Sequence, residues 1–276
     1  MDGVVLADKA AGRTSHDITT MVRRGLGERK AGHAGTLDPF ATGLLIVLVG
    51  RARRVQRFFT ALPKEYLAVA RFGAVSTTGD PDGEITQTGT GPPGELVLPT
   101  GTIRQRPPAY SAIRIDGTRA YERVRRGETV VIPERVVTVH AFEELWREDD
   151  RAGFRIVCSS GTYVRSLIAD LGDAYTEELR RTRIGPLRIE DADPQRVIPM
   201  QQALGFFASL RIDGDLARRA ANGVAIEPPE PIAPPRAGWE LPDGPPEVLL
   251  LDAQGPIALA QRREDGLLKP VVGFRA

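Results

Sequence analysis

The chain has 276 residues, 41% of them hydrophobic, which is enough for one large domain with an ordinary core plus a small one. Its formal net charge is only +1 at pH 7, so any surface for a polyanion must come from an uneven distribution of charge. The single cysteine, Cys158, excludes an intrachain disulfide and favours a cytoplasmic location, and the longest aliphatic run, Leu44 to Val49, is too short to span a bilayer.

The charge is distributed unevenly along the chain. Residues 1–80 carry 12 basic and 7 acidic side chains, and the stretch from Arg23 to Arg57 holds eight basic residues against only Glu28 and Asp38. Further on, acidic side chains outnumber Arg147 between residues 143 and 150. This separation predicts one face that attracts a polyanion while the whole protein stays near neutral.

Hydrophobic periodicity predicts strands and a helix in the first part of the chain. A helix over about His16–Arg24 follows Ser15, which can cap it, and ends at Gly25. The apolar run Leu44–Val49 is typical of a strand covered on both faces. Strands are also expected at Val4–Ala7 and where Tyr66, Ala68, Ala70 and Phe72 alternate with more polar residues.

The middle of the chain adds two strands and two helices. Strands are expected at Val136–Phe142 and Phe154–Ser159, and helices at Thr118–Arg126 and Tyr163–Leu171. Neighbouring strands with interspersed helices indicate an α+β fold around a largely antiparallel sheet.

A composition shift near residue 205 divides the chain. The proline-rich stretch 227–246 reads as a loop, flanked by a helix at Leu216–Ala221 and by strands at Val248–Leu251 and Ile257–Gln261. We therefore expect a large domain over residues 1–208 and a small β domain over residues 209–276.

The segment from Gly32 to Gly43 places one carboxylate, Asp38, in a glycine-rich turn inside the basic region. Its glycines permit unusual backbone conformations and a close approach of a ligand, and Pro39 biases Asp38 toward extended geometry. By itself, the segment also fits an ordinary surface loop with an Asp-Pro turn.

The same segment, Gly32-His33-Ala34-Gly35-Thr36-Leu37-Asp38-Pro39 followed by Ala41-Thr42-Gly43-Leu44-Leu45, resembles the active-site motif of the TruB family of tRNA pseudouridine synthases. Together with further matches it covers about residues 3–190. The further matching segments, in the order of the family, are Gly3–Lys9, Lys64-Glu65-Tyr66, Thr77–Gly83, Pro107–Ala112, Gly161–Ser166 and Leu179-Arg180-Arg181-Thr182.

The resemblance implies a fold and an activity. The fold is the pseudouridine synthase fold, a mixed, largely antiparallel sheet flanked by helices, with a small PUA-like RNA-binding β domain at residues 209–276. Such enzymes isomerise a uridine in the tRNA T-loop, usually at position 55, to pseudouridine. The partner is then the T-arm of tRNA, no obligate protein partner is expected, and the redox-neutral reaction calls for neither a cofactor nor a metal.

The resemblance also assigns a catalytic group of three residues. Asp38 is the catalytic carboxylate, Tyr66 packs on the flipped uracil and moves a proton, and Arg165 pairs with Asp38. A carboxylate can act here as a nucleophile or assist proton removal at the ribose, and the sequence leaves both routes open. Without the resemblance, Tyr66 also fits a core aromatic residue and Arg165 a solvated helix residue.

The substrate-binding residues come from the same matches. His33 is expected beside the displaced base, and Tyr163 and Leu179 in the base pocket. Lys9 belongs to this group although the usual Lys-Pro of the family is Lys9-Ala10 here, and Asp173–Glu178 reads as a shortened, acidic loop before Leu179. The residues expected near phosphate are Lys64, Arg180 and Arg181.

Other interpretations of the sequence remain. The chain could be an RNA-binding or tRNA-folding protein with lost or secondary isomerase activity, or the guide-RNA-dependent catalytic subunit of a ribonucleoprotein. Asp80-Pro81-Asp82 resembles a phosphotransferase pair but lies in turn-like sequence rather than after an apolar strand. The three histidines share no metal-ligand spacing with Cys158, so a metal site is not expected.

Overall fold

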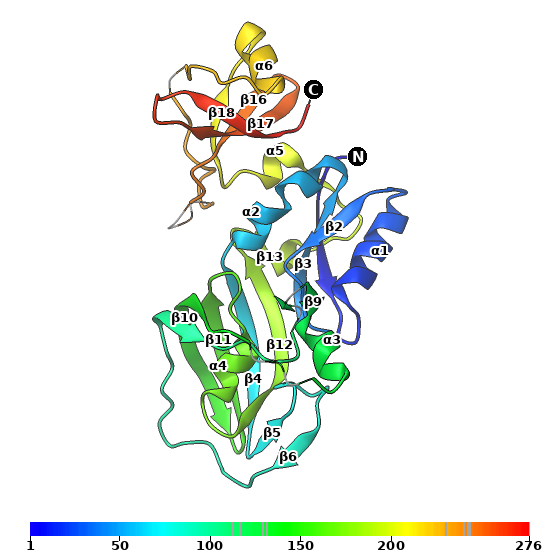
Figure 1. Ribbon diagram of the computed structural model, residues 1–276, viewed down its shortest axis with the longest axis vertical. Helices are drawn as coiled ribbons and strands as arrows, with labels where there is room; N and C mark the ends of the chain where they lie inside the picture. The colour runs from blue at the N-terminus through cyan, green and yellow to red at the C-terminus, as the bar shows by residue number, and fades with distance from the viewer. Residues whose placement is uncertain are drawn as a thin grey trace.

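A computed structural model describes residues 1–111, 113–115, 117–128, 130, 132–229, 231–239, 241 and 244–275. The molecule is elongated, with a small C-terminal sheet at one end and the hairpin of β5 (Ala74–Ser76) and β6 (Ile85–Gln87) at the other (Figure 1). None of the described helices is long and apolar enough to cross a membrane.

One large mixed sheet forms the body of the protein, with β2 and β13 pairing to it beside the main order of strands. Its described neighbours are antiparallel except for the pair β3 and β12. The strands, in spatial order, are β14 (Ile198–Pro199), β1 (Gly3–Lys9), β3 (Thr42–Val49), β12 (Ala174–Ile184), β4 (Lys64–Phe72), β11 (Arg151–Cys158), β10 (Arg135–Glu148) and β7 (Gly101–Gln105).

The sheet opens between β3 and β12, which pair only at Thr42 with Arg180 and at Gly43 with Arg181. Gly43 has a φ of 104°, and a Cβ there would lie 2.2 Å from the Arg181 carbonyl oxygen, so this junction requires glycine. The glycine-rich turn that carries Asp38 immediately precedes this junction, so the close pairing of β3 with β12 fixes where the turn ends.

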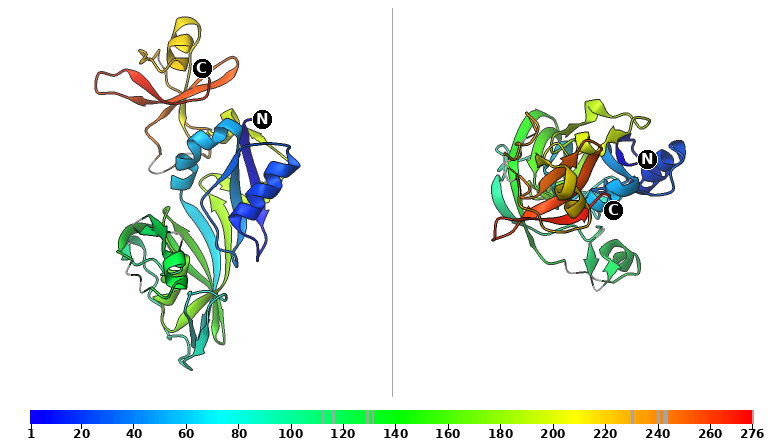
Figure 2. Two further views of the ribbon diagram at one scale, coloured as in Figure 1. Left: turned by 45° about the vertical axis from the view of Figure 1, so that its right-hand side comes forward. Right: turned by 90° about the horizontal axis from the view of Figure 1, so that it is seen from above.

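The first helix, α1 (Ser15–Gly25), confirms the expected element but not its cap. Thr14 is the N-cap, and it exchanges hydrogen bonds with Asp17 in a capping box. The Ser15 hydroxyl instead accepts from the Leu37 N–H at 2.9 Å and so ties α1 to the Asp38 turn. Figure 2 places α1 on the outer side of β1 and β3, where Ile18 and Val22 pack.

On the other half of the sheet, the alternation of β4 puts Tyr66, Ala68, Ala70 and Phe72 on one buried face. This face is covered by α4 (Val164–Ala169), which is shorter than the expected helix over Tyr163–Leu171. The helix expected at Thr118–Arg126 is also shorter, because the segment opens as β9 (Thr118–Arg119) before α3 (Ala120–Arg125).

Two segments that were expected to be loops are wholly or partly strands, so these two predictions were wrong. Residues 174–178 belong to β12 and pair with β4, with a bulge between Thr176 and Glu178 that breaks the period-two pattern a strand normally shows. The glycine-rich turn likewise begins as a strand, β2 (Ala31–Ala34), which pairs with β3. In both places the tertiary pairing overrides a weak local pattern.

The C-terminal sheet begins at Ala208, next to the expected boundary, with β15 (Ala208–Arg211) parallel to β16 (Val248–Asp252). It continues with β17 (Gly255–Arg262) and β18 (Leu268–Gly273), and α6 (Gly214–Ala221) packs on it. A small sheet with one packed helix is therefore present in the region where a small β domain is expected.

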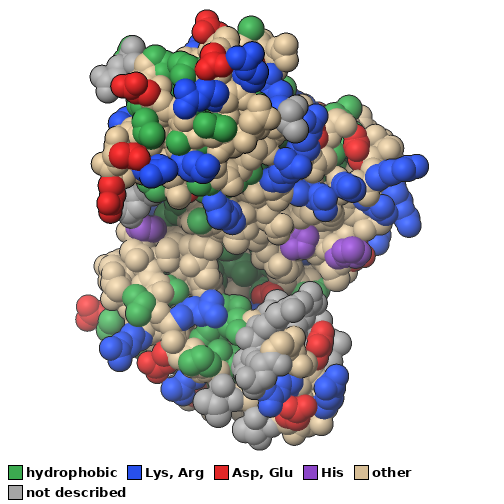
Figure 3. Space-filling view, turned by 45° about the horizontal axis from the view of Figure 1, so that its top comes forward, with side chains coloured by type: hydrophobic (Ala, Val, Ile, Leu, Met, Phe, Trp, Pro, Cys, Tyr) green, Lys and Arg blue, Asp and Glu red, His purple; other side chains and the backbone are tan. Residues whose placement is uncertain are grey.

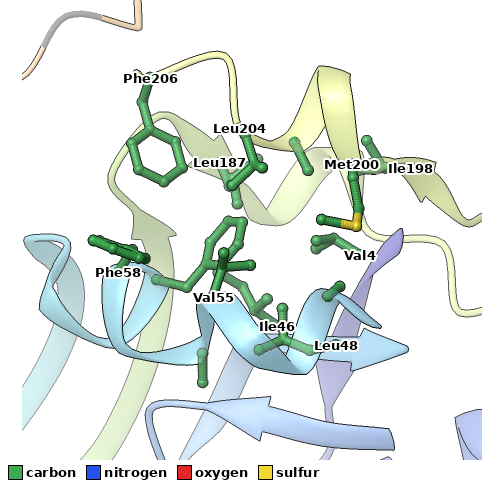
Figure 4. Close-up of a cluster of buried hydrophobic side chains, with 14 of the residues drawn as sticks. Val4, Ile46, Leu48, Val55, Phe58, Leu187, Ile198, Met200, Leu204 and Phe206 are labelled. Carbon is green, nitrogen blue, oxygen red and sulfur yellow. The ribbon is translucent and has the colours of Figure 1, made fainter. Parts of the chain in front are cut away.

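The two regions share a core. Phe206, Leu249 and Leu259 belong to the same buried cluster as residues of β1, β3 and α2 (Gln56–Ala61), and Figure 4 shows the part of this cluster around Val55, Phe58 and Leu204. The C-terminal sheet is therefore packed directly onto the body of the protein.

Candidate active site

Asp38 lies in the turn between β2 and β3, with its carboxylate Oδ2 3.0 Å from Nη2 of Arg165. The Asp38 side chain is 37% exposed, whereas that of Arg165 is only 3% exposed. Burial of the carboxyl group raises the pKa of Asp38, the Arg165 charge opposes this, and the nearby Asp80 charge adds to it. The expected pair of Asp38 and Arg165 is therefore formed, with the carboxylate as its accessible member.

The Arg165 guanidinium is fixed by three further acceptors. Its Nη1 donates to the Thr78 carbonyl at 2.6 Å and to Asp80 Oδ2 at 2.9 Å, and its Nη2 donates to the Tyr110 carbonyl at 3.0 Å. These contacts join α4 to two loops that are distant in sequence. The planar fork of arginine suits this arrangement, because each of its two terminal nitrogens, Nη1 and Nη2, meets two oxygens.

Asp80 is a buried site residue that the sequence did not single out for this role. Its side chain is 6% exposed, and Oδ1 accepts from the Thr78 hydroxyl at 2.5 Å and from the Asp82 N–H at 3.1 Å. The signal was present, since Asp80 lies in the matched segment Thr77–Gly83, but sequence spacing could not show that it would face Arg165.

Tyr66, Leu179 and Arg181 lie together beside the Asp38 turn. Tyr66 and Leu179 belong to the buried cluster that includes Leu37. Arg181 is 1% exposed, and it donates from Nε to the Leu44 carbonyl at 2.8 Å and from Nη2 to the Gly35 carbonyl at 2.9 Å. Burial raises the pKa of the Tyr66 hydroxyl, with the Arg181 charge acting against it.

The two lysines expected to meet RNA are buried. Lys9 Nζ donates to the carbonyls of Arg13 at 2.7 Å, Pro39 at 3.0 Å and Ala10 at 3.1 Å, so it holds the chain on either side of the turn. Burial lowers the pKa of Lys9, and the charge of Asp38 opposes this. This position offers no exposed ammonium to a phosphate.

Lys64, the first residue of β4, is 5% exposed and donates to the carbonyls of Thr60 and Leu62. Burial, with a smaller contribution from the Arg181 charge, lowers the pKa of Lys64 to about 7. Lys64 and Arg181 thus lie buried behind the turn, and neither offers an exposed phosphate contact.

The remaining expected residues lie at more open positions. His33 is half-buried on β2, and burial followed by the Arg181 charge lowers its pKa, so the neutral ring is favoured at neutral pH. Tyr163 is half-buried, with the Arg135 guanidinium 5.7 Å from the centre of its ring. Arg180 is 41% exposed and pairs with Asp8 at 2.7 Å.

Basic side chains gather on one face of the molecule (Figure 3), as the sequence predicts. Figure 3 shows a hollow across one face with Lys and Arg side chains gathered along one side of it. A separate recess of about 500 Å³ is lined by Lys30, which precedes β2, and by Arg53 and Arg54 of η1 (Gly50–Val55), with Asp2 and Glu28 also in its wall. Within the described part of the chain, no group of His, Cys, Asp and Glu side chains could hold a metal.

The chain is similar to known proteins over most of its length. Residues 23–164 match the family model described as TruB family pseudouridylate synthase (N terminal domain). The chain is 40% identical to the tRNA pseudouridine synthase B of Thermobifida fusca, over 99% of this chain and 98% of that protein. It is 44% identical to the protein of the same name from Corynebacterium glutamicum, over 78% of this chain and 77% of that one.

Solved structures share the fold at lower identity. A chain of an H/ACA ribonucleoprotein bound to a substrate RNA containing 2'-deoxyuridine is 24% identical, with a TM-score of 0.68 over 99% of this chain and 85% of that chain. A chain of a Cbf5-Nop10-Gar1 complex is 25% identical, with a TM-score of 0.65 over 94% and 78%. With the family match and the near-full-length relatives, these findings show that the chain belongs to the TruB family of pseudouridylate synthases.

Proposed function

We propose that this protein isomerises the uridine at position 55 of the tRNA T-loop to pseudouridine. The observation that carries the proposal is Asp38, a partly exposed carboxylate held at 3.0 Å by the buried Arg165, in the segment that matches the family's active-site motif. A carboxylate in this position can begin the cleavage of a glycosidic bond, because it supplies a charged oxygen that the fold has fixed in direction.

The reaction breaks the bond between the ribose and N1 of uracil, turns the base and rejoins it through C5, which loses its proton. Asp38 starts the reaction, either by attacking the ribose carbon or by assisting removal of a ribose proton. Arg165 keeps the carboxylate ionised and oriented. The raised pKa of Asp38 means that its ionised form is held in a poorly solvated place, where it is a stronger base than in water.

The uridine must leave the stack of the T-loop before Asp38 can reach its ribose, and the protein must replace the lost stacking. Tyr66 and Leu179 form the apolar wall nearest the turn, and Tyr163 supplies a second ring. Because burial raises the pKa of Tyr66, its hydroxyl stays protonated at neutral pH and can donate a hydrogen bond to the base.

The buried cations have a positioning role in this proposal. Lys9 and Arg181 donate to backbone carbonyls on both sides of Asp38, at Pro39 and Gly35, and so fix the turn that carries it. Phosphate contacts then come from exposed residues such as Arg180, whose ion pair with Asp8 is open to solvent and can be exchanged for a phosphate.

The two alternative functions, a guide-RNA-dependent subunit and an RNA-folding protein, have less support. The higher identity, 40% over nearly the full length, is to proteins named for tRNA modification, and the identity to chains of the ribonucleoproteins is 24–25%. An RNA-folding protein without isomerase activity would not require Asp38 and Arg165 to be paired at a partly exposed position. A tRNA substrate also places the activity in the cytoplasm.

The test is release of tritium from uridine labelled at C5 in a T-arm transcript, followed by mapping of pseudouridine. Release should occur with EDTA present, since no step uses a metal, and should be abolished in a transcript with cytidine at position 55. Tight binding of the transcript without release would contradict the proposal and would favour the RNA-folding alternative.

A further inference from the structure

Gln105, at the end of β7, makes two hydrogen bonds to the backbone of one distant residue. Its Nε2 donates to the Tyr163 carbonyl at 3.0 Å, and its Oε1 accepts from the Tyr163 N–H at 2.8 Å. The Gln105 side chain is buried, with 2% exposure. An amide is suited to this task, since it offers one donor and one acceptor side by side, as the backbone does.

Tyr163 is the N-cap residue of α4, and α4 has no side-chain cap hydrogen bond of its own there. Gln105 therefore holds the start of this six-residue helix from outside. A second interaction lies beside it, where the Ser166 hydroxyl donates to the Arg106 carbonyl at 2.9 Å. The beginning of α4 is thus fixed to the segment that follows β7.

The same segment also holds the far end of Arg165, the second residue of α4. Five residues after Gln105, the Tyr110 carbonyl accepts from Arg165 Nη2 at 3.0 Å, and this nitrogen is the one that faces Asp38. The segment from Gln105 to Tyr110 therefore fixes both the backbone from which Arg165 extends and the tip of its side chain.

We propose that Gln105 is a positioning residue for the isomerisation, acting by fixing the start of α4 so that Arg165 meets Asp38. The inference rests on the proposed function, because it concerns the same reaction. The side-chain hydrogen bonds of Gln105 go to Tyr163 and not to Asp38. It acts through Arg165 and through Tyr163, whose ring is expected to line the base pocket.

A positioning role predicts a change that reduced stability alone would not produce. If Arg165 moves away, its charge stabilises the Asp38 carboxylate less, so the pH below which the reaction fails should move upward. The other groups that act on Asp38 stay in place in such a variant. The charged and titratable groups facing Asp38 are Lys9 from β1, Tyr66 from β4, Asp80 from the loop after β5, and Tyr163 and Arg165 at the start of α4.

The first test is Gln105→Met in the full-length protein, which keeps the length of the side chain and removes both hydrogen bonds. The single-turnover rate on a T-arm transcript should fall about 10- to 100-fold, since small displacements of a catalytic group have effects of this size. Affinity for the transcript should stay within about twofold, because every residue expected to bind phosphate is intact. On the low-pH side of the pH–rate profile (its acid limb), the fall in rate should begin at a higher pH than in the wild type.

A matched control is Gln261→Met in β17, which removes the hydrogen bond from Nε2 to Glu247 at 2.9 Å in the C-terminal sheet. It should leave the rate and its pH dependence unchanged. The inference is overturned if folded Gln105→Met keeps a rate within about twofold of the wild type. It is also overturned if rate and affinity fall together while the acid limb stays in place.

A second variant, Gln105→Glu, tests the inference if Gln105→Met does not fold. The ionised carboxylate keeps an acceptor for the Tyr163 N–H but lacks the donor to the Tyr163 carbonyl, whereas the protonated acid has both. Its rate relative to the wild type should therefore improve as the pH is lowered, and a ratio that is flat with pH would overturn the inference. A wild type that releases no tritium in the same assay would instead overturn the proposed function.

Discussion

The body of the protein and its C-terminal sheet differ in how many charged side chains they bury. Around the candidate site, five charged side chains are buried, whereas Glu247, just before β16, is the one such residue in the described part of residues 208–275. Burying a charge is unfavourable unless partners compensate for it. The buried charges around the site are Lys9, Lys64, Asp80, Arg165 and Arg181.

The difference indicates which region carries the chemistry. Each buried cation at the site donates to backbone carbonyls or to carboxylates, and the network ends at Asp38, the one carboxylate in it that is partly exposed. In the C-terminal sheet, charged pairs such as Arg263 with Asp265 lie at the surface. Under the proposed function, the body fixes the reactive carboxylate, and the C-terminal sheet is expected to offer surface for binding.

The largest effect is expected for Arg165→Lys, which breaks the network at its centre. Lysine keeps the positive charge but cannot donate to Asp38, Asp80 and two carbonyls in one plane. Turnover on the T-arm should fall by about 100-fold or more, while affinity changes little. Single-turnover rates and filter-binding measurements would separate the two.

Arg180→Lys is the matched control for that change. Arg180 lies on β12 with an exposed ion pair to Asp8, so lysine can replace it with little effect. An equal fall in rate and affinity in Arg165→Lys would mark Arg165 as a phosphate contact instead. A larger fall in rate in Arg180→Lys than in Arg165→Lys would contradict the central place of Arg165 in the network.

A smaller effect, limited to affinity, is expected in the C-terminal sheet. Replacing the exposed Arg262 and Arg263 by glutamine should weaken binding of full-length tRNA and reduce its salt dependence by about 0.7–0.9 for each phosphate that is no longer bound. The rate at saturating tRNA should not change. A fall in that rate would contradict the separation of binding from chemistry.

The smallest effect concerns stability and its dependence on pH. Burial lowers the pKa of Lys64 to about 7 from 10.5, so between these values the unfolded chain binds a proton that the folded chain does not. The free energy of unfolding of the wild type should then rise with pH above 7 relative to that of Lys64→Met, by about 1–3 kcal/mol at about pH 9.

Urea unfolding of both proteins at the two pH values measures this difference. The exposed Lys30→Met is the control and should give a flat difference. If the difference in free energy of unfolding between the wild type and Lys64→Met is also independent of pH, the Lys64 amino group is not buried as the structure places it.

Much of the fold could be predicted from the sequence. The runs that became β3, β4, β16 and β17 have clear patterns, because one or both faces of each strand are buried. The strand β12 could not be recognised, because its bulge interrupts the alternation and Glu177 and Glu178 face solvent, where they pair with Arg151.

The site could be predicted in part for a similar reason. Asp38 and Arg165 were found through the residues next to them in matched motifs, and the structure pairs them. The positions of Lys9 and Asp80 depend on partners distant in sequence, namely the Pro39 carbonyl and the Arg165 guanidinium, and no local pattern reports such interactions. Their roles therefore required the folded chain.

The most direct test of the central claim is the single-turnover rate of Asp38→Asn on a T-arm transcript. Asparagine keeps the shape of Asp38 but has no negative charge, so pseudouridine formation should be abolished. Because the fold raises the pKa of Asp38, its ionised form is less favourable in the folded than in the unfolded chain, so the variant should be at least as stable as the wild type near pH 7. Its tRNA affinity should stay equal or rise, since a negative charge is removed near the RNA. A folded variant with a rate within about tenfold of the wild type, or about 1.4 kcal/mol in barrier, would contradict the assignment of Asp38.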